Sequence, residues 1–233
     1  MNFYKTWADV RNLGVDDEAF FESFLLGSDI SAKLLNEGAQ EELSFAIKFL
    51  ESIPLERFME TISRIKVCVE LKTAVIPCFS SFSNGAVRLN ELLEFAPEGL
   101  SYTEIGHHIM NSANQLAQQK YGENHAKLAE AMSLVSIDYH RPAIVRATAL
   151  GHFLTAVPWS NKADLLRKLL LRNQCVQLLL QQAINGEALY RDIARRMSVS
   201  TAMRRRTNVK CCIEFILEPE SVQNLLQNIN WEI

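Results

Sequence analysis

The sequence predicts a mainly α-helical protein, with an N-terminal helical domain followed by one or two helix-turn-helix units. Apolar residues make up 48% of the 233 residues, enough for a core, and charged residues make up 22%, an ordinary surface. Nine glycines and six prolines are few for this length, which disfavours an architecture of strands and turns. Apolar side chains also recur at helical spacing, as at Leu43, Ala46, Ile47 and Leu50.

Charge and linker composition divide the chain into three expected segments: 1–86, an acidic helical domain; 87–160, a second domain; and 161–233, a third, helical domain. Residues 1–95 carry 9 Lys or Arg against 15 Asp or Glu, whereas residues 141–210 carry 13 basic side chains against three acidic ones. Such a concentration is what binding to phosphates requires, because several cations must replace condensed counterions. The alternative is that this basic region meets the acidic N-terminal half.

The N-terminal segment is expected to form a series of short helices. Gly27 ends the first of them, Asp29 is a plausible N-cap for the second, and Pro54 and Pro77 bracket the last. The polar stretch 78–85 is the best candidate for a linker. The expected helices cover residues 16–27, 29–38, 41–53 and 54–76.

Glu70 and Lys72 match the E-x-K element of metal-dependent nucleases. That chemistry needs two carboxylates that hold magnesium and a lysine that positions water. The flanking sequence favours a helix, and no Pro-Asp pair precedes the triplet. A magnesium-dependent nuclease is therefore the least favoured hypothesis, and an exposed helix edge the ordinary interpretation.

The second segment opens with a capping-box pattern, Ser101 followed by Glu104. The helix that follows is expected to turn Leu100, Ile105, His108 and Ile109 inward, so His108 is interpreted as an interior histidine. In the next helix, an inward stripe leaves Asn124 and Lys127 outward; it consists of His125, Leu128, Ala129 and Met132.

A tight turn and a short strand complete this segment. Asp138 to Pro142 is expected to be a polar turn, and residues 143–147 a β-like stretch. Thr148 is expected to cap a helix that runs through Leu154. The order of parts is thus helix, helix, third helix, hairpin and closing helix.

The succession SYTEIG (101–106), YGENHAKLAEAMSLV (121–135) and IVRATALGHFL (144–154) resembles the winged-helix DNA-binding modules of bacterial restriction-modification proteins and related regulators. Those families carry a T-x-L-G step after the wing, and Thr148-Ala149-Leu150-Gly151 matches it. The linker from Met110 to Gly122 departs from the pattern, since it is long for a compact helix-turn-helix. The resemblance covers roughly residues 87–160 and implies that this segment is a winged-helix domain with double-stranded DNA as the partner.

A second copy is expected in the third segment. Residues 161–184 read as one long helix that Asn185-Gly186 ends, and 187–197 as the first helix of a helix-turn-helix. Ser200 is expected to cap the last long helix, which Pro219 ends. This copy has no evident wing.

The candidate DNA contacts lie on the recognition helix of each expected helix-turn-helix unit and on the wing. They are cationic, amide and hydroxyl side chains, which contact phosphates and base edges. Arg204 projects outward in the run Arg204-Arg205-Arg206, whereas Arg205 and Arg206 point toward neighbouring helices and are expected to pair with Glu187 or Asp192. Tyr139-His140-Arg141 either contacts a phosphate or decorates the turn. The predicted DNA-binding residues are Lys120, Asn124, Lys127, Arg141, Arg146, Arg204, Thr207, Asn208 and Lys210.

The sequence contains no motif for nucleotide binding, nucleophilic catalysis or metal binding. It has no P-loop, GxGxxG, GxSxG or HExxH pattern and no CxxC spacing, so no cofactor or metal is expected. The five cysteines are expected to be reduced thiols in a cytoplasmic protein, and no apolar run is long enough to span a membrane. The main alternative to a non-catalytic DNA-binding protein is an adaptor, whose N-terminal helices bind a protein partner or a second copy.

Overall fold

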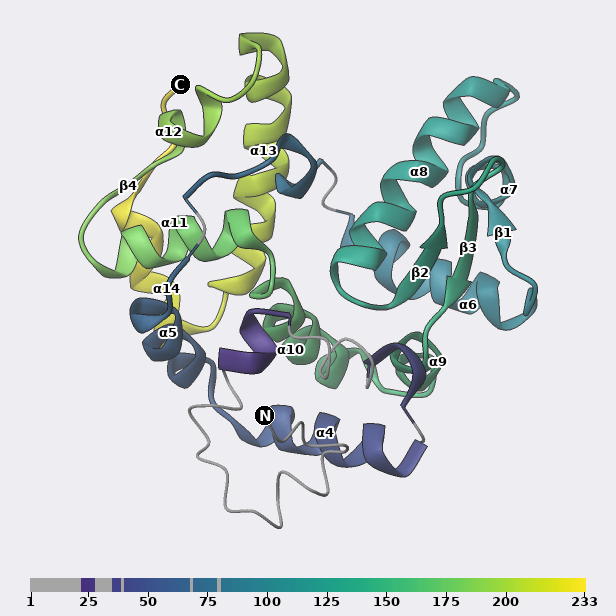
Figure 1. The fold of residues 1–233 in the computed structure, drawn as a ribbon, viewed down its shortest axis with the longest axis horizontal. Helices are drawn as coiled ribbons and strands as arrows, with labels where there is room; N and C mark the ends of the chain where they lie inside the picture. The colour runs from purple at the N-terminus through teal and green to yellow at the C-terminus, as the bar shows by residue number, and fades with distance from the viewer. Residues whose placement is uncertain (1–21, 28–34, 39, 68, 79–80) are drawn as a thin grey trace, which may run out of the picture. The chain divides into compact units, whose positions relative to one another are not determined.

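The computed structural model describes residues 22–27, 35–38, 40–67, 69–78 and 81–233, and it is mainly helical (Figure 1). The chain divides into two compact units that alternate along the sequence. Unit 1 takes its described residues from Met1–Ile30, Ala46–Ser80 and Asp164–Ile233, and unit 2 from Ser31–Phe45 and Ser81–Ala163. These units do not coincide with the three consecutive segments expected from the sequence. Within the described ranges, no helix is long and apolar enough to cross a membrane.

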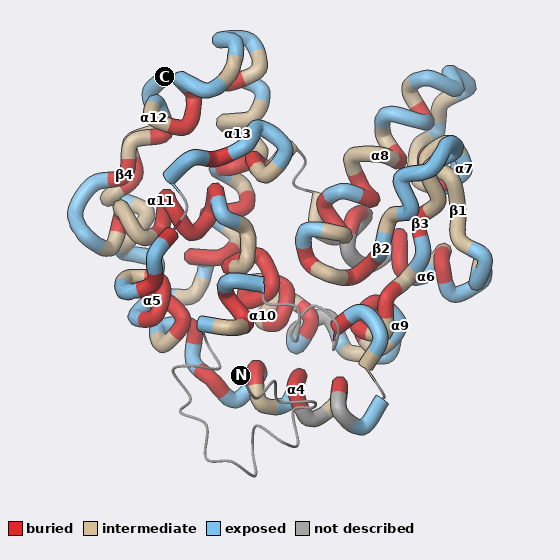
Figure 2. The backbone as a smooth tube through the Cα atoms, viewed as in Figure 1, coloured by how far each residue is buried: buried red, intermediate tan, exposed pale blue. Residues whose placement is uncertain are grey.

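Unit 2 contains a small antiparallel sheet and the helices that pack on it (Figure 1). The sheet has the order β1-β3-β2, with Val145 of β3 opposite both Leu100 and Ile137. Its core is apolar; Ile105, Ala129 and Val145 are fully buried (Figure 2). In chain order the elements are the π-helical turn η2 (Ser83–Arg88), α6 (Leu89–Glu94), β1 (Leu100–Ser101), α7 (Tyr102–Ile109), α8 (Gln115–Ala131), β2 (Val135–Asp138), β3 (Ile144–Ala147) and α9 (Ala149–Thr155).

The predicted caps of unit 2 are confirmed. Ser101 and Glu104 form a capping box at the start of α7, and the Thr148 hydroxyl accepts a hydrogen bond from the Gly151 amide at 3.0 Å. Asn114 caps α8, accepting from the Ala117 amide at 3.1 Å. The expectation for His108 is wrong, because its side chain is exposed rather than interior.

Unit 1 is also built mainly from helices, with a two-stranded parallel pair in which Ala188 lies opposite Ile229. Its C-terminal part runs helix, strand, helix, long helix. The elements are α5 (Leu55–Arg64), η1 (Thr73–Val75), α11 (Gln174–Ile184), β4 (Ala188–Leu189), α12 (Tyr190–Ala194), α13 (Val199–Ile216), α14 (Glu220–Gln223), η3 (Asn224–Asn228) and β5 (Ile229–Asn230). Two further helices, α4 (Gln40–Ser52) and α10 (Trp159–Leu170), carry residues of both units.

Two long helices expected from the sequence are shorter in the structure. The helix expected over 54–76 ends at Arg64, and Glu70 and Lys72 lie in the irregular chain that follows. The helix expected over 161–184 is broken at Asn173, whose side chain caps α11 by accepting from the amides of Cys175 and Val176. Because Asn173 also donates to the Val75 carbonyl at 2.9 Å, the break is fixed by a contact far away in the sequence.

Smaller differences concern element ends. The expected helix 187–197 is a short strand followed by α12, and Ser198 rather than Ser200 caps α13, accepting from the Thr201 amide. The stretch 78–85, expected to be a linker, is helical from Ser83, where η2 begins. The helix expected over 41–53 is confirmed as α4, and the chain turns at Gly27, with φ +65°, as expected. The predicted cap Asp29 lies outside the described residues.

Buried polar side chains cross-link unit 1. Lys168, only 1% exposed, donates to the Leu50 carbonyl at 2.7 Å and pairs with Asp164 at 2.6 Å. Gln177 and Gln181 likewise donate to carbonyls of residues more than a hundred positions away, such as Leu25. Since buried polar groups stabilise a fold only when they are hydrogen-bonded, these contacts fix the helices of unit 1 in one arrangement.

Candidate nucleic-acid interface

The outward side of α8 is the first part of the candidate interface. The buried side runs through His125, Leu128 and Ala129, as predicted, and also includes Ala126. On the opposite side, spacings of three and four residues place five side chains in one line, which we call the α8 stripe. The α8 stripe consists of Leu116, Lys120, Glu123, Lys127 and Ala131.

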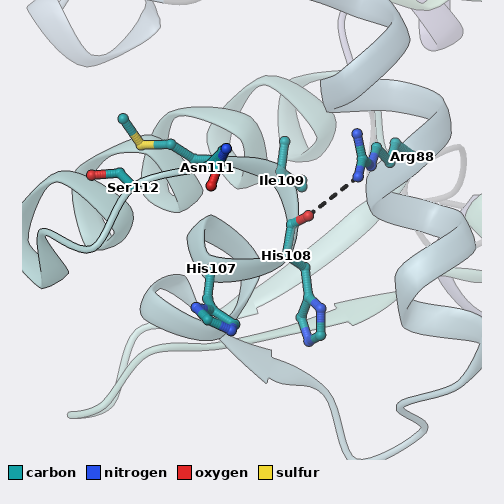
Figure 3. Close-up of a pocket in the computed structure, with 7 residues that line it drawn as sticks. Arg88, His107, His108, Ile109, Asn111 and Ser112 are labelled. Atoms are coloured by element: carbon teal, nitrogen blue, oxygen red, sulfur yellow. Dashed lines mark hydrogen bonds between the residues drawn. The ribbon is translucent and has the colours of Figure 1, made fainter.

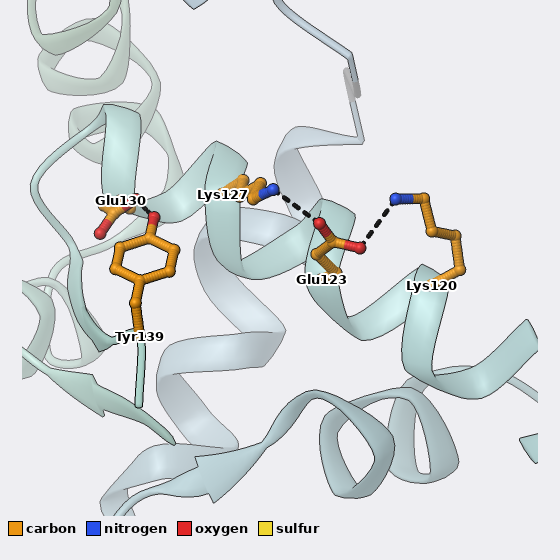
Figure 4. Close-up of polar contacts among 5 residues, drawn as sticks. All are labelled: Lys120, Glu123, Lys127, Glu130 and Tyr139. Carbon is orange, nitrogen blue, oxygen red and sulfur yellow. Dashed lines mark hydrogen bonds and ion pairs between the residues drawn. The ribbon is translucent and has the colours of Figure 1, made fainter. Parts of the chain in front are cut away.

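Glu123 lies at the middle of the α8 stripe and binds both predicted lysines (Figure 4). Its two carboxylate oxygens lie 2.7 Å from Nζ of Lys120 and 2.6 Å from Nζ of Lys127. Partial burial raises the pKa of Glu123, but the hydrogen bonds and charges of the two lysines outweigh it, and the net pKa is lowered. The carboxylate is therefore ionised at neutral pH and offsets part of the positive charge of α8. Asn124, the third predicted residue of this helix, is half-buried beside it.

The turn between β2 and β3 is the second part. The Tyr139 hydroxyl donates to the Glu130 carboxylate of α8 at 2.5 Å, which ties the turn to the helix (Figure 4). Burial is the largest influence on Glu130 and raises its pKa. Asp138 pairs with the His140 ring, and this hydrogen bond raises the pKa of His140. The predicted Arg141, beside this pair, is exposed.

Arg146, predicted on the same hairpin, is exposed on β3 opposite Ser136 of β2. Its charge is one of the influences that lower the pKa of Asp138, after the hydrogen bonds that this carboxylate accepts from His140. The hairpin therefore presents two exposed arginines and one ionised carboxylate. Both arginines are candidates from the sequence, and the Tyr139–Glu130 contact was not predicted.

A shallow pocket of about 390 Å³ lies at the C-terminal end of α7 (Figure 3). Arg88 donates to the carbonyl of His108 at 3.3 Å, and this satisfies one of the carbonyls that end the helix. The imidazoles of His107 and His108 point away from the Arg88 guanidinium in Figure 3. The polar groups of this pocket therefore do not converge on one ligand position, and its arginine serves the helix end.

Unit 1 carries a second candidate surface of its own, on α12 and α13. Arg204, Thr207 and Lys210 are exposed, as the sequence predicts for outward positions of α13. Lys210 has a loose ion pair with Glu214, at 3.8 Å. Asn208 differs, because its amide donates to the carbonyl of Cys78 at 2.9 Å, and is half-buried. The structure thus gives Asn208 a packing role within unit 1.

The other two arginines of the run point inward. Arg205 donates to the Ile76 carbonyl and Arg206 to the Trp231 carbonyl. The predicted direction is right, but the partners are backbone carbonyls rather than Glu187 or Asp192; Asp192 pairs with Arg195 at 3.2 Å. Arg191 of α12 and Arg195, which follows the last residue of α12, are exposed. Neither was predicted as a contact, although the sequence shows that basic residues are dense in this stretch. Val199 and Met203 add two exposed apolar side chains near the start of α13.

Glu70, Lys72 and the cysteines are the remaining side chains with the potential for reactive chemistry. Glu70 and Lys72 are exposed, and within the parts of the chain that the structure describes no three Asp, Glu, His or Cys side chains are grouped to hold a metal. Among the cysteines that the structure describes, Cys175, Cys211 and Cys212 form no disulfide. Burial raises the pKa of Cys175 to about 12, so this thiol is unreactive at neutral pH.

Comparisons with models of known protein families, with curated proteins and with solved structures find no match to this chain. Its function is therefore inferred from the element order, the charges and the contacts given above.

Proposed function

We propose that this protein is a non-catalytic double-stranded DNA-binding protein, in which unit 2 is a winged-helix domain and α12–α13 of unit 1 a second helix-turn-helix. The observation that carries the proposal is the chain order α6, β1, α7, α8, β2, β3 together with the sheet order β1-β3-β2. In this order α7 and α8 are the helix-turn-helix, α8 is the third helix that enters the major groove, and the β2–β3 turn is the wing.

Charge and exposure support the assignment of residues in unit 2. Lys120 and Lys127 keep exposed ammonium groups on α8, and Arg141 and Arg146 are exposed on the hairpin. Such cations position a protein by binding phosphates, whereas the side chains at the centre of the helix read base edges. An α-helix fits the major groove, which is about 12 Å wide.

The surface of α12–α13 is the more cationic of the two. Residues 187–210 contain seven arginines or lysines against Glu187 and Asp192. Of these seven, Arg205 and Arg206 serve the interior, and Arg196 donates to the Val69 carbonyl. The exposed remainder is Arg191, Arg195, Arg204 and Lys210. In the proposal this surface supplies most of the salt-dependent affinity and α8 most of the selectivity. The resemblance to modules of restriction-modification proteins favours a regulator or the recognition part of a restriction-type or mobile-element system.

The second candidate is a protein–protein adaptor. It is favoured by the charge of Glu123, which offsets part of the charge of α8, and by two large exposed apolar side chains in unit 2. Phe95 is 88% exposed after α6, and Leu116 is 77% exposed near the start of α8. An adaptor of this kind would bury them against a partner.

Duplex binding by the wild type and three variants tests the proposal. A fluorescently labelled mixed-sequence duplex of about 25 base pairs is titrated at low salt, so that phosphate contacts dominate. Lys127→Ala and Arg204→Ala are each expected to weaken binding several-fold, whereas Lys48→Ala, which removes an exposed lysine of α4, is expected to leave it unchanged. Absence of binding at any protein concentration would favour the adaptor. Equal losses in all three variants would mean that the two proposed surfaces are wrongly assigned.

A further inference from the structure

We infer that Glu123 is a specificity-determining residue that selects a cytosine in the major groove, an inference that rests on the proposed DNA-binding function. Glu123 occupies the middle of the α8 stripe, three residues after Lys120 and four before Lys127. The middle of an outward helix face is the part that approaches base edges most closely when the helix lies in the groove. Helix α8 thus carries an acceptor where a base edge is expected.

A carboxylate in that position discriminates among bases by simple chemistry. An ionised carboxylate is only an acceptor, and the pairs of Glu123 with Lys120 and Lys127 keep it ionised. In the major groove, guanine presents two acceptors and thymine one, and adenine places an acceptor beside its amino donor. Cytosine presents an amino donor alone, so it is the base that a glutamate accepts from.

The two lysines make the approach of a carboxylate to DNA feasible. An unpaired carboxylate would be repelled by the phosphates, but Lys120 and Lys127 hold Glu123 between them at 2.7 and 2.6 Å. Their side chains are 68% and 42% exposed, and each ammonium has three donors, so each can reach a phosphate while it still holds Glu123. The arrangement gives up some affinity for any duplex and gains selectivity for one base pair.

The competing explanation is that the three side chains only stabilise α8 through ordinary helix-surface ion pairs. This explanation and ours differ in one respect. If the pairs serve helix stability alone, the base preference of the protein does not depend on residue 123. A substitution that keeps the shape and removes the charge therefore separates them, and Glu123→Gln is that substitution.

The experiment selects preferred sites from a randomised duplex library with wild-type protein, Glu123→Gln and Glu91→Gln, the last as a control carboxylate on α6. Affinities for the selected site and for each single base-pair replacement are then measured. We expect the wild type and Glu91→Gln to prefer C·G at one position by about tenfold. Glu123→Gln is expected to lose that preference, to shift toward A·T because glutamine pairs with adenine, and to bind mixed-sequence duplex more tightly.

The outcomes distinguish the inference from the proposed function. If the wild type binds no duplex, both the proposed DNA-binding function and the role of Glu123 are contradicted. If the wild type binds but shows no cytosine preference, or if Glu123→Gln retains that preference, DNA binding stands and the role of Glu123 is overturned. Thermal melts of both variants identify a folding defect, and the tighter binding of mixed-sequence duplex expected for Glu123→Gln is a gain that a misfolded protein would not show.

Discussion

Gly122 of α8 lies directly against the backbone of Tyr102 at the start of α7. A Cβ atom on Gly122 would lie 1.9 Å from the Tyr102 carbonyl oxygen, and one on Gly106 would lie 1.9 Å from that of Gln118. Both distances are far inside van der Waals contact. The two glycines therefore let α7 and α8 cross at closer range than any other residue would allow.

Gly122→Ala is expected to destabilise the protein, although alanine is the better helix former by about 1 kcal/mol. The added methyl group meets backbone rather than a movable side chain, and overpacking of this kind costs about 1–3 kcal/mol or more. Urea denaturation followed by circular dichroism measures the change. Gln119→Ala, at an exposed position of α8 three residues before Gly122, is the control. It should change the free energy of unfolding by less than about 0.5 kcal/mol. A more stable Gly122→Ala would contradict the close crossing.

Lys168→Met tests the buried lysine of unit 1. Methionine fills similar space but leaves the Leu50 and Glu51 carbonyls without their donor at that position. An unsatisfied buried acceptor costs about 1–3 kcal/mol, which is the destabilisation expected. Lys48→Met on the exposed side of α4 is the matched control and should have little effect. Equal stability of Lys168→Met and the wild type would mean that these hydrogen bonds contribute nothing net.

Arg204 and Arg205 are neighbours with opposite expected phenotypes. Arg204 is exposed, so Arg204→Ala should weaken duplex binding and leave the melting temperature unchanged. Arg205 donates to the Ile76 carbonyl, so Arg205→Ala should lower the free energy of unfolding by about 1–3 kcal/mol. Parallel melts and duplex titrations check both. The reverse pattern would show that the orientation of α13 is wrong.

The pair of Asp138 and His140 predicts a pH dependence. Because the hydrogen bond to Asp138 raises the pKa of His140, the cationic ring persists above its ordinary pKa of about 6.5. The stabilisation that accompanies the raised pKa of His140 is fully present below the ordinary pKa of about 6.5. It is lost as the pH rises through the raised pKa. The lowered pKa of Asp138 has the opposite sign, since its contribution is lost as pH falls through that value.

An NMR titration of the His140 ring checks this directly. Asp138→Asn should bring the pKa of His140 back toward about 6.5. An unchanged His140 titration in Asp138→Asn would contradict the pairing.

Local signals in the sequence were sufficient for much of the helical frame. Ser101 with Glu104 and Thr148 were predicted as caps because capping depends on residues three positions apart. The inward stripe of α8 and the outward positions of Arg204, Thr207 and Lys210 follow from helical periodicity in the same way.

Contacts between distant residues were out of reach. The break at Asn173 depends on the Val75 carbonyl, and Asn208 is held by the Cys78 carbonyl, each about a hundred residues away or more. The tie between Tyr139 and Glu130 depends on how the hairpin folds back on α8. The prediction that His108 is interior was wrong. Its helical spacing places it near the apolar side of α7, but α7 is exposed at this position.

The salt dependence of duplex binding tests the central claim most directly. Affinity of the wild type for a mixed-sequence duplex is measured between about 50 and 200 mM salt, and log K is plotted against log salt. Each phosphate contact contributes about 0.9 to the slope, so contacts from several of the exposed cations predict a steep linear fall. These cations are Lys120, Lys127, Arg141, Arg146, Arg191, Arg195, Arg204 and Lys210. A slope near zero, or no binding across this range, would contradict a DNA-binding function.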